Sequence, residues 1–131
     1  MRRTPLAKKG KSSTSKLQKK CDALLSPIIT KLHPLCLLCS GKTQVAHHHV
    51  HKSKSLILRY DFDNLVPLCH GCHFMLHQNE SYWASKITQK RGMKWFEALE
   101  RKKNQLIRAD LLWYQQNFER LTTLNENNAD N

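Results

Sequence analysis

The first 60 residues of this 131-residue chain contain a single acidic side chain. The chain also lacks an apolar run near the ~20 residues that a bilayer-spanning helix needs, which argues against a membrane protein. No apolar segment follows the stretch Met1–Pro5, so we expect no secretory signal and a cytoplasmic location. With no such signal and five cysteines, an odd number, the sequence also argues against a secreted disulfide scaffold.

Positive charge is concentrated in the first half of the chain. Residues 1–60 carry 13 basic and 1 acidic side chains, whereas residues 61–131 carry 9 of each, so the net charge of +12 lies in the first part. Such an asymmetry predicts a polyanionic partner, most often a nucleic acid. The alternative is a solvated basic tail that only aids solubility. We expect residues 1–15 to form a flexible basic arm.

Hydrophobic spacing up to residue 68 predicts one helix and two short strands. Apolar residues recur at helical intervals from Leu17 to Leu32. Pro27 interrupts this pattern, so we expect a kink or a restarted helix with Ser26 as its N-cap. The segments 43–50 and 65–68 are typical of short strands, the second of them followed by a helix.

Helical patterns dominate the second half. A helix is expected from Cys69 to His77, and apolar positions from Trp95 to Leu121 indicate one long amphipathic helix. Its apolar face would serve packing within the chain or, alternatively, formation of a homodimer. The predicted fold class is therefore α+β and mostly helical, with a C-terminal helical extension over 81–124 and a disordered tail over 125–131.

Four of the five cysteines form two C-x-x-C pairs, Cys36 with Cys39 and Cys69 with Cys72. Without a secretion signal, this pattern predicts a zinc site rather than disulfides. Four thiolates complete a tetrahedral shell and leave no position for a substrate, so the zinc would be structural. The alternative is four reduced cysteines in the core. Cys21 is left outside the pattern.

Histidines form two tight groups, the run His47–His49 and the pair His73 and His77. The pair is spaced i, i+4 on the predicted helix, so both rings share a face and can bind one metal ion. A third ligand from the histidine run would leave positions open for water and phosphate, which is typical of a catalytic metal. The alternative is chance placement on the surface.

These histidines and cysteines together resemble the signature of HNH endonucleases, whose ββα-metal site consists of two short strands and a helix around one divalent cation. The spacing is similar to that of the nuclease colicins, and the two cysteine pairs resemble the zinc-bearing HNH branch. The region from Cys21 to Cys39 and the helical tail resemble, more weakly, phage recombination endonucleases of the NinG type. The matching stretches are His48–Val50, Asn64–Cys69, Cys72–His73 and His77.

The resemblance implies a metal-dependent endonuclease that hydrolyses DNA phosphodiester bonds, with branched or recombination DNA suggested by the NinG-type likeness. Residues 16–80 would form its HNH core, with the N-terminal helix and the zinc knuckle. Carried over to this sequence, the catalytic ion is bound by His48, His73 and His77. His49 is the general base, and Asn64 orients that base or contacts the metal.

The histidine run leaves a second assignment open, in which His47 is the ligand and His48 the base. We favour His48 and His49 because an apolar residue, here Val50, usually follows the base, and because the spacing to Asn64 then fits. A free imidazole with a pKa near ~6.5 can accept a proton from water at neutral pH, whichever residue supplies it.

The metal and the partner are less closely specified. Imidazole ligands favour Zn²⁺, Ni²⁺ or Mn²⁺ over Mg²⁺, but related enzymes use magnesium, so the catalytic ion stays open. Lys52, Lys54 and Arg59 are expected to contact phosphates, of DNA rather than RNA. An alternative function is a non-catalytic, zinc-stabilised nucleic-acid-binding module, and another is a toxin that cuts RNA.

Overall fold

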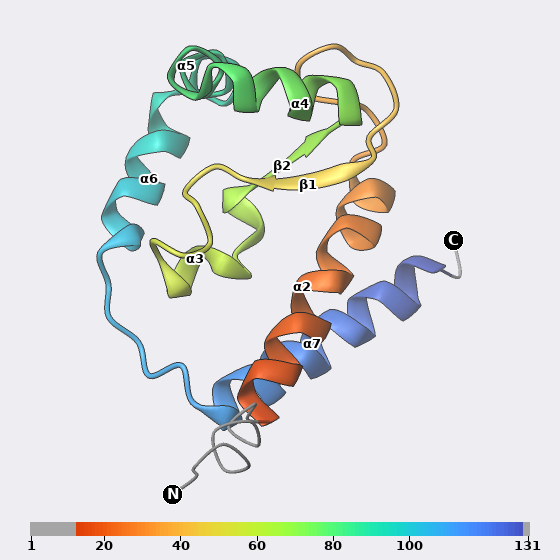
Figure 1. The fold of residues 1–131 in the computed structure, drawn as a ribbon, viewed down its shortest axis with the longest axis vertical. Coiled ribbons are helices and arrows are strands. Elements are labelled where there is room, and N and C mark those ends of the chain that lie inside the picture. Colours follow the sequence, from red (N-terminus) through yellow and green to blue (C-terminus); the bar gives the residue numbers. More distant parts are fainter. Residues whose placement is uncertain (1–12, 130–131) are drawn as a thin grey trace, which may run out of the picture.

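The computed structural model describes residues 13–129, with side chains up to residue 127. These residues form a mostly helical α+β fold with one small antiparallel sheet, as the sequence predicts (Figure 1). None of the described helices is long and apolar enough to cross a membrane. The elements in chain order are α2 (Ser13–Leu32), β1 (Val45–His48), α3 (Leu56–Arg59), the short 3₁₀ helix η1 (Phe62–Asn64), β2 (Leu65–Leu68), α4 (His70–Gln78), α5 (Glu80–Arg91), α6 (Met93–Lys103) and α7 (Leu111–Ala129).

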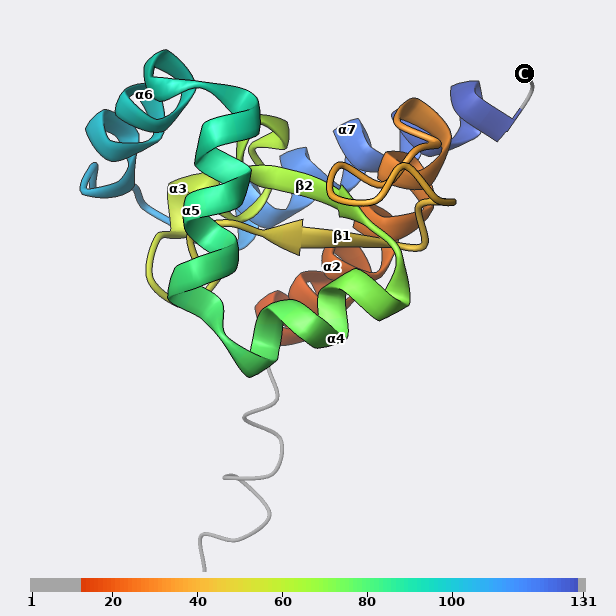
Figure 2. The same cartoon turned by 90° about the horizontal axis from the view of Figure 1, so that it is seen from above.

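The two predicted strands pair with each other. Val45 lies opposite Leu68 and His48 opposite Leu65 in an antiparallel register. Every residue of β2 is buried, while β1 is half-buried. Both α2 and α4 contact β1 (Figures 1 and 2), so this strand brings its alternating side chains close to two different helices.

The core has two parts. One lies where α2 crosses α7, the most extensive contact between elements, and the other lies between β2, α4 and α5. The apolar face of α7 therefore packs within the chain, which is the first of the two roles expected for it. Trp113 packs against the first part, and Trp83 and Trp95 against the second, consistent with core roles.

The helix α2 does not restart at Pro27, one of the two outcomes expected there. It runs without interruption from Ser13 to Leu32. Ser26 is not an N-cap, because its hydroxyl accepts a hydrogen bond of 3.0 Å from the Ala46 N–H. A proline inside a helix costs ~3 kcal/mol, but Ile28 and Ile29 directly after it are fully buried. Burial of these side chains holds the helical path through the proline.

The single long helix predicted from Trp95 to Leu121 is wrong, because α6 ends at Lys103 and α7 begins at Leu111. Asp110 caps the new helix by accepting a 3.0 Å hydrogen bond from the Trp113 N–H. Leu106, expected on the apolar face, is 97% exposed in the connection. Local capping at Asp110 and the exposure of Leu106 thus override the apolar periodicity.

The two predicted chain ends also differ from the structure. The helix α2 begins at Ser13, within the arm predicted for residues 1–15, and residues 1–12 of that arm lie outside the described residues. At the other end α7 continues to Ala129, so the tail predicted from Asn125 is helical to that point.

Candidate functional site

The four paired cysteines meet in one cluster, and their Sγ atoms all lie within 4.8 Å of one another. The Sγ atoms of Cys39 and Cys69 are 3.7 Å apart. In a tetrahedral site with metal–sulfur bonds of about 2.3 Å, neighbouring sulfurs lie about 3.8 Å apart. The donor set therefore fits a tetrahedral metal ion. Cys21 is separate from this cluster and is buried between α2 and α7, where its Sγ contacts the Tyr114 carbonyl.

Backbone groups around the cysteine cluster point toward the sulfurs. The N–H of Gly41 donates to the Cys39 Sγ, and the N–H of Cys72 donates to the Cys69 Sγ, each over 3.3 Å. The Cys72 N–H is the main cause of a lowered pKa of Cys69, to about 7. Ser40 adopts a positive φ of 64°, and a Cβ on Gly41 would lie only 3.2 Å from the Cys39 Sγ. Backbone N–H donors thus lie against two of the four sulfurs, whereas burial raises the pKa of Cys72.

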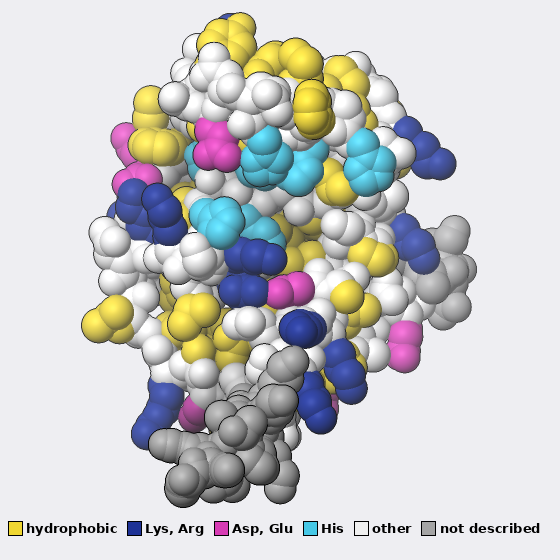
Figure 3. Space-filling model, viewed as in Figure 1, with side chains coloured by type: hydrophobic (Ala, Val, Ile, Leu, Met, Phe, Trp, Pro, Cys, Tyr) yellow, Lys and Arg dark blue, Asp and Glu magenta, His cyan; other side chains and the backbone are white. Residues whose placement is uncertain are grey.

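A second cluster surrounds a pocket of about 280 Å³ between α2, β1 and α4, which we call the histidine pocket. Figure 3 shows histidine side chains gathered on this face, with Lys and Arg side chains beside them. The lining residues are Asp22, Leu25, Ser26, Ala46, His47, His48, His51, Lys52, His73 and His77.

Three imidazoles approach one another in this pocket. The Nε2 atoms of His73 and His77 are 3.1 Å apart, and the His47 ring centroid lies 5.2 Å and 6.1 Å from theirs. Two imidazole nitrogens bound to one ion at about 2.1 Å lie roughly 3.0–3.4 Å apart. The spacing of the helix pair thus suits a shared ion, with His47 as the nearest third ring. The three rings lie farther apart than the four cysteine sulfurs do. Among residues 13–129, the cysteine cluster is the one close set of three or more metal-binding side chains.

His48 does not join His73 and His77, and the ligand role predicted for it is corrected. Its Nε2 lies 2.9 Å from the Arg59 carbonyl oxygen. The cause is the alternation of β1, which sends His47 and His48 to opposite sides of the strand. Burial lowers the pKa of His48, while the Arg59 carbonyl acts in the opposite direction. His48 still lines the histidine pocket together with His47, the ligand in the alternative assignment of the histidine run.

His49, the predicted general base, does not lie in the histidine pocket. It follows the last residue of β1, and its ring packs 4.9 Å from that of Trp95. Its Nδ1 is buried and has no hydrogen-bond partner among the described residues. Burial, followed by the nearby Arg91 charge, lowers its pKa. The ring lies outside the lining of the histidine pocket, facing α6 instead.

Asn64 is fully buried and holds the backbone of the loop between β1 and β2. Its Nδ2 donates to the Val50 and Leu58 carbonyls at 2.9 Å and 3.2 Å, and its Oδ1 accepts from the Val50 N–H at 2.8 Å. The Asn64 side chain thus closes the loop on itself. These three side-chain hydrogen bonds join Asn64 to backbone groups of the loop rather than to a histidine ring.

The three residues predicted to contact phosphate differ in their exposure to solvent. Lys52 lines the histidine pocket and Lys54 is exposed beside it. Arg59, by contrast, is only 8% exposed, and its guanidinium donates to Asp22 over 3.0 Å and 2.6 Å. The predicted contact of Arg59 with DNA is therefore wrong, because burial and the ion pair occupy the side chain.

Sequence reasoning missed Asp22, which pairs with Arg59 and lines the histidine pocket. One signal could have found it, since Asp22 is the single acidic residue among the first 60. Its partner Arg59 lies 37 positions away in the chain, so local sequence patterns could not predict the pair.

Comparisons with protein-family models, curated proteins and solved structures give no significant match for this chain. Any functional conclusion therefore rests on the side chains and their geometry.

Proposed function

We propose that this protein is a metal-dependent endonuclease of the HNH type, which hydrolyses phosphodiester bonds in DNA with His48 as general base. The elements β1, β2 and α4 would form its ββα unit. The observation that carries the proposal is the convergence of His47, His73 and His77 in one pocket whose wall includes His48, with its ring oriented by the Arg59 carbonyl.

The hydrogen bond to Arg59 determines which nitrogen of His48 is available. A carbonyl oxygen only accepts, so the Nε2 of His48 must carry the proton of this bond. The Nδ1 of the neutral ring then has a free lone pair. Hydrolysis requires an acceptor for the proton of the attacking water, and a positioned imidazole is the most common one. His48 is thereby equipped to take that proton.

His47, His73 and His77 would hold the ion. Imidazole donors fit Zn²⁺, Ni²⁺ or Mn²⁺ better than Mg²⁺, and the identity of the ion stays open among these four. When bound, a divalent cation supplies charge neutralisation at the phosphate and at the leaving oxygen. The cysteine cluster would hold a separate, structural zinc, because its four thiolates already complete a tetrahedral set.

The charge distribution supports a nucleic acid as the substrate, and the HNH resemblance favours DNA. Lys52 lines the pocket, and α2, which forms one of its walls, carries the exposed lysines Lys16, Lys19 and Lys20. Among residues 13–129 no carboxylate lies within ion-pair distance of these three side chains. Exposed lysines without a carboxylate partner are available for phosphates, and such contacts bind DNA largely without regard to sequence. Branched DNA is the structure to test first, given the NinG-type likeness.

A plasmid-nicking assay with Mg²⁺, Mn²⁺, Ni²⁺ and Zn²⁺ tests the proposal. We expect the wild-type protein to nick, and the His48→Ala variant to lose about 10²- to 10⁴-fold in rate, the usual contribution of a general base. His49→Ala is the matched control and should retain most activity. An RNA substrate in parallel separates the RNA-cutting alternative. Tight DNA binding without nicking under any of the four metals would instead indicate the non-catalytic binding module.

A further inference from the structure

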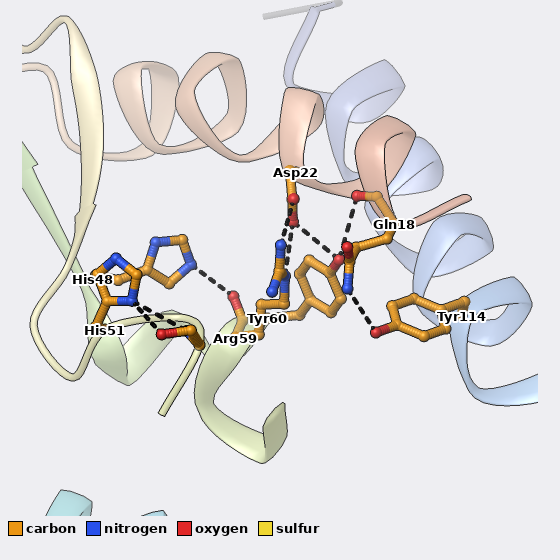
Figure 4. A network of polar contacts seen from close by, with 8 residues as sticks. Gln18, Asp22, His48, His51, Arg59, Tyr60 and Tyr114 are labelled. Carbon is orange, nitrogen blue, oxygen red and sulfur yellow. Dashed lines mark hydrogen bonds and ion pairs between the residues drawn. The ribbon is translucent and has the colours of Figure 1, made fainter. Parts of the chain in front are cut away.

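The carbonyl that orients His48 belongs to Arg59, whose side chain is bound by a residue of α2. Figure 4 shows Asp22 of α2 reaching the Arg59 side chain, while the Arg59 carbonyl faces the His48 ring. Asp22 accepts from the Arg59 Nε at 3.0 Å and from its Nη2 at 2.6 Å. The same carboxylate accepts a third bond, of 2.9 Å, from the Tyr60 hydroxyl.

This contact is a buried one. The side chains of Arg59 and Asp22 are 9% and 23% exposed. Two parallel N–H···O bonds fix the guanidinium in both distance and plane, which a single bond to a lysine would not do. The side chain of Arg59 is therefore anchored to α2 at one end, and its peptide group carries the acceptor for His48 at the other.

The helix α7 restrains the next residue of the same loop. The Arg120 Nη2 donates to the Tyr60 carbonyl at 2.8 Å. The Tyr60 ring packs against those of Trp113 and Tyr114, and the Tyr114 hydroxyl accepts a 2.9 Å hydrogen bond from Gln18. The Arg59 side chain is thus held by α2 and the Tyr60 carbonyl by α7, so both crossed helices restrain the chain around the Arg59 carbonyl.

We propose that Asp22 is a positioning residue for the reaction: by holding Arg59, it fixes the carbonyl that sets the ring orientation and tautomer of His48. The inference rests on the proposed function, in which His48 is the base. Asp22 lines the histidine pocket, but its two oxygens are engaged by Arg59 and Tyr60. It acts on the reaction through these partners.

Two variants test the role of Asp22, and a third is the control. Asp22→Asn keeps the size of the side chain but loses the charge and one acceptor. Arg59→Lys keeps the charge but cannot form the bidentate pair. Lys102→Gln removes a different ion pair of the same loop, the 2.8 Å contact with Asp61, and should leave cleavage unchanged. Thermal unfolding of all three separates loss of stability from loss of positioning.

Nicking kinetics give the first readout. For Asp22→Asn and Arg59→Lys we expect kcat to fall about 10- to 100-fold, the range seen when a group that orients a catalytic ligand is removed. The KM for DNA should stay within a factor of two of the wild-type value. An Asp22→Asn variant with unchanged kcat, or one that binds DNA more tightly at full kcat because Arg59 is freed for phosphate, would overturn the inference.

The second readout does not depend on cleavage. Long-range ¹H–¹⁵N spectra of the histidine rings, recorded at one fixed pH, report which nitrogen carries the proton. We expect the Nε2–H tautomer for His48 in the wild-type protein and in Lys102→Gln, and a mixture of tautomers in Asp22→Asn and Arg59→Lys. If the wild-type protein cleaves no substrate, the proposed function is wrong. The spectrum still decides in that case whether Asp22 determines the tautomer of His48. An unchanged His48 tautomer in both variants contradicts that control.

Discussion

The cysteine cluster and the histidine pocket share one helix but differ in how closely their donors meet. Cys69 and Cys72 stand at the start of α4, and His73 and His77 follow on its next turns. The four thiolates lie within 4.8 Å of one another, whereas the imidazoles surround a pocket of about 280 Å³. A compact donor set stabilises a fold, and an open one leaves room for a substrate.

The closed cluster also explains how the open one is held. The sheet consists of two strands of four residues each, and a two-stranded sheet alone is marginally stable in water. The cysteine cluster joins the turn before β1 to the helix after β2, because Cys39 and Cys69 lie on either side of the sheet in sequence. The position of α4 relative to β1, and so of His73 relative to His47, depends on this link.

The largest effect is expected from breaking the closed cluster. Metal binding to structural zinc sites contributes on the order of 10 kcal/mol in small zinc-finger peptides, so Cys69→Ser should leave residues 36–77 largely unfolded. Circular dichroism and the zinc content of the purified protein measure this. Cys21→Ala is the matched control, since it removes a cysteine outside the cluster and should keep the zinc. A folded, zinc-free Cys69→Ser protein would contradict the assignment.

The next effect concerns the open pocket. Removing one ring by His73→Ala should abolish binding of a second metal ion while the first, in the thiolates, remains. Elemental analysis after equilibration with Ni²⁺ or Zn²⁺ should therefore fall from two ions per chain to one. His70→Ala removes a neighbouring histidine of the same helix and should retain both ions. Equal stoichiometry in the two variants would show that the imidazoles do not form a site.

A smaller effect is expected at the rim of the pocket. If Lys52 contacts a phosphate, Lys52→Ala should weaken DNA binding and reduce the slope of log K against log salt by about 0.9, the value for one lost contact. Fluorescence anisotropy over a salt series measures the slope. Lys90, an exposed lysine at the end of α5, gives the control substitution Lys90→Ala, for which the slope should not change.

The smallest effect is expected far from both clusters. Lys102 pairs with Asp61 at 2.8 Å, and the two side chains are 36% and 22% exposed. Exposed pairs contribute about 0.2–1 kcal/mol and are screened by salt. Lys102→Gln should lower the free energy of unfolding in urea by that amount at low salt and by less at 1 M NaCl. A loss that salt does not reduce would indicate a packing role for the lysine stem.

The sequence predicted the parts of the molecule that depend on local pattern. The strands and the helix after Cys69 follow from the alternation and the spacing of apolar residues. The two C-x-x-C pairs were sufficient to predict the four-cysteine cluster, because the spacing within each pair suits a turn that presents both sulfurs to one metal ion. These features need no knowledge of the rest of the chain.

The roles within the histidine run could not be fixed in the same way. Alternation puts His47 and His48 on opposite sides of β1, but it does not say which side faces α4. That choice depends on how β1 packs between α2 and α4. The partners of Arg59 were unpredictable for a similar reason, because Asp22 reaches it from a helix whose position is set by contacts with α7.

The crossing of α2 and α7 has a consequence for how the molecule is made. Arg120 contacts Tyr60 across 60 positions of the chain, so this restraint is missing from a nascent polypeptide until the last helix has left the ribosome. A growing chain can close its cysteine cluster early, since all four thiols are synthesised by residue 72. The contact between Arg120 and the Tyr60 carbonyl, by contrast, forms only after α7 has been translated.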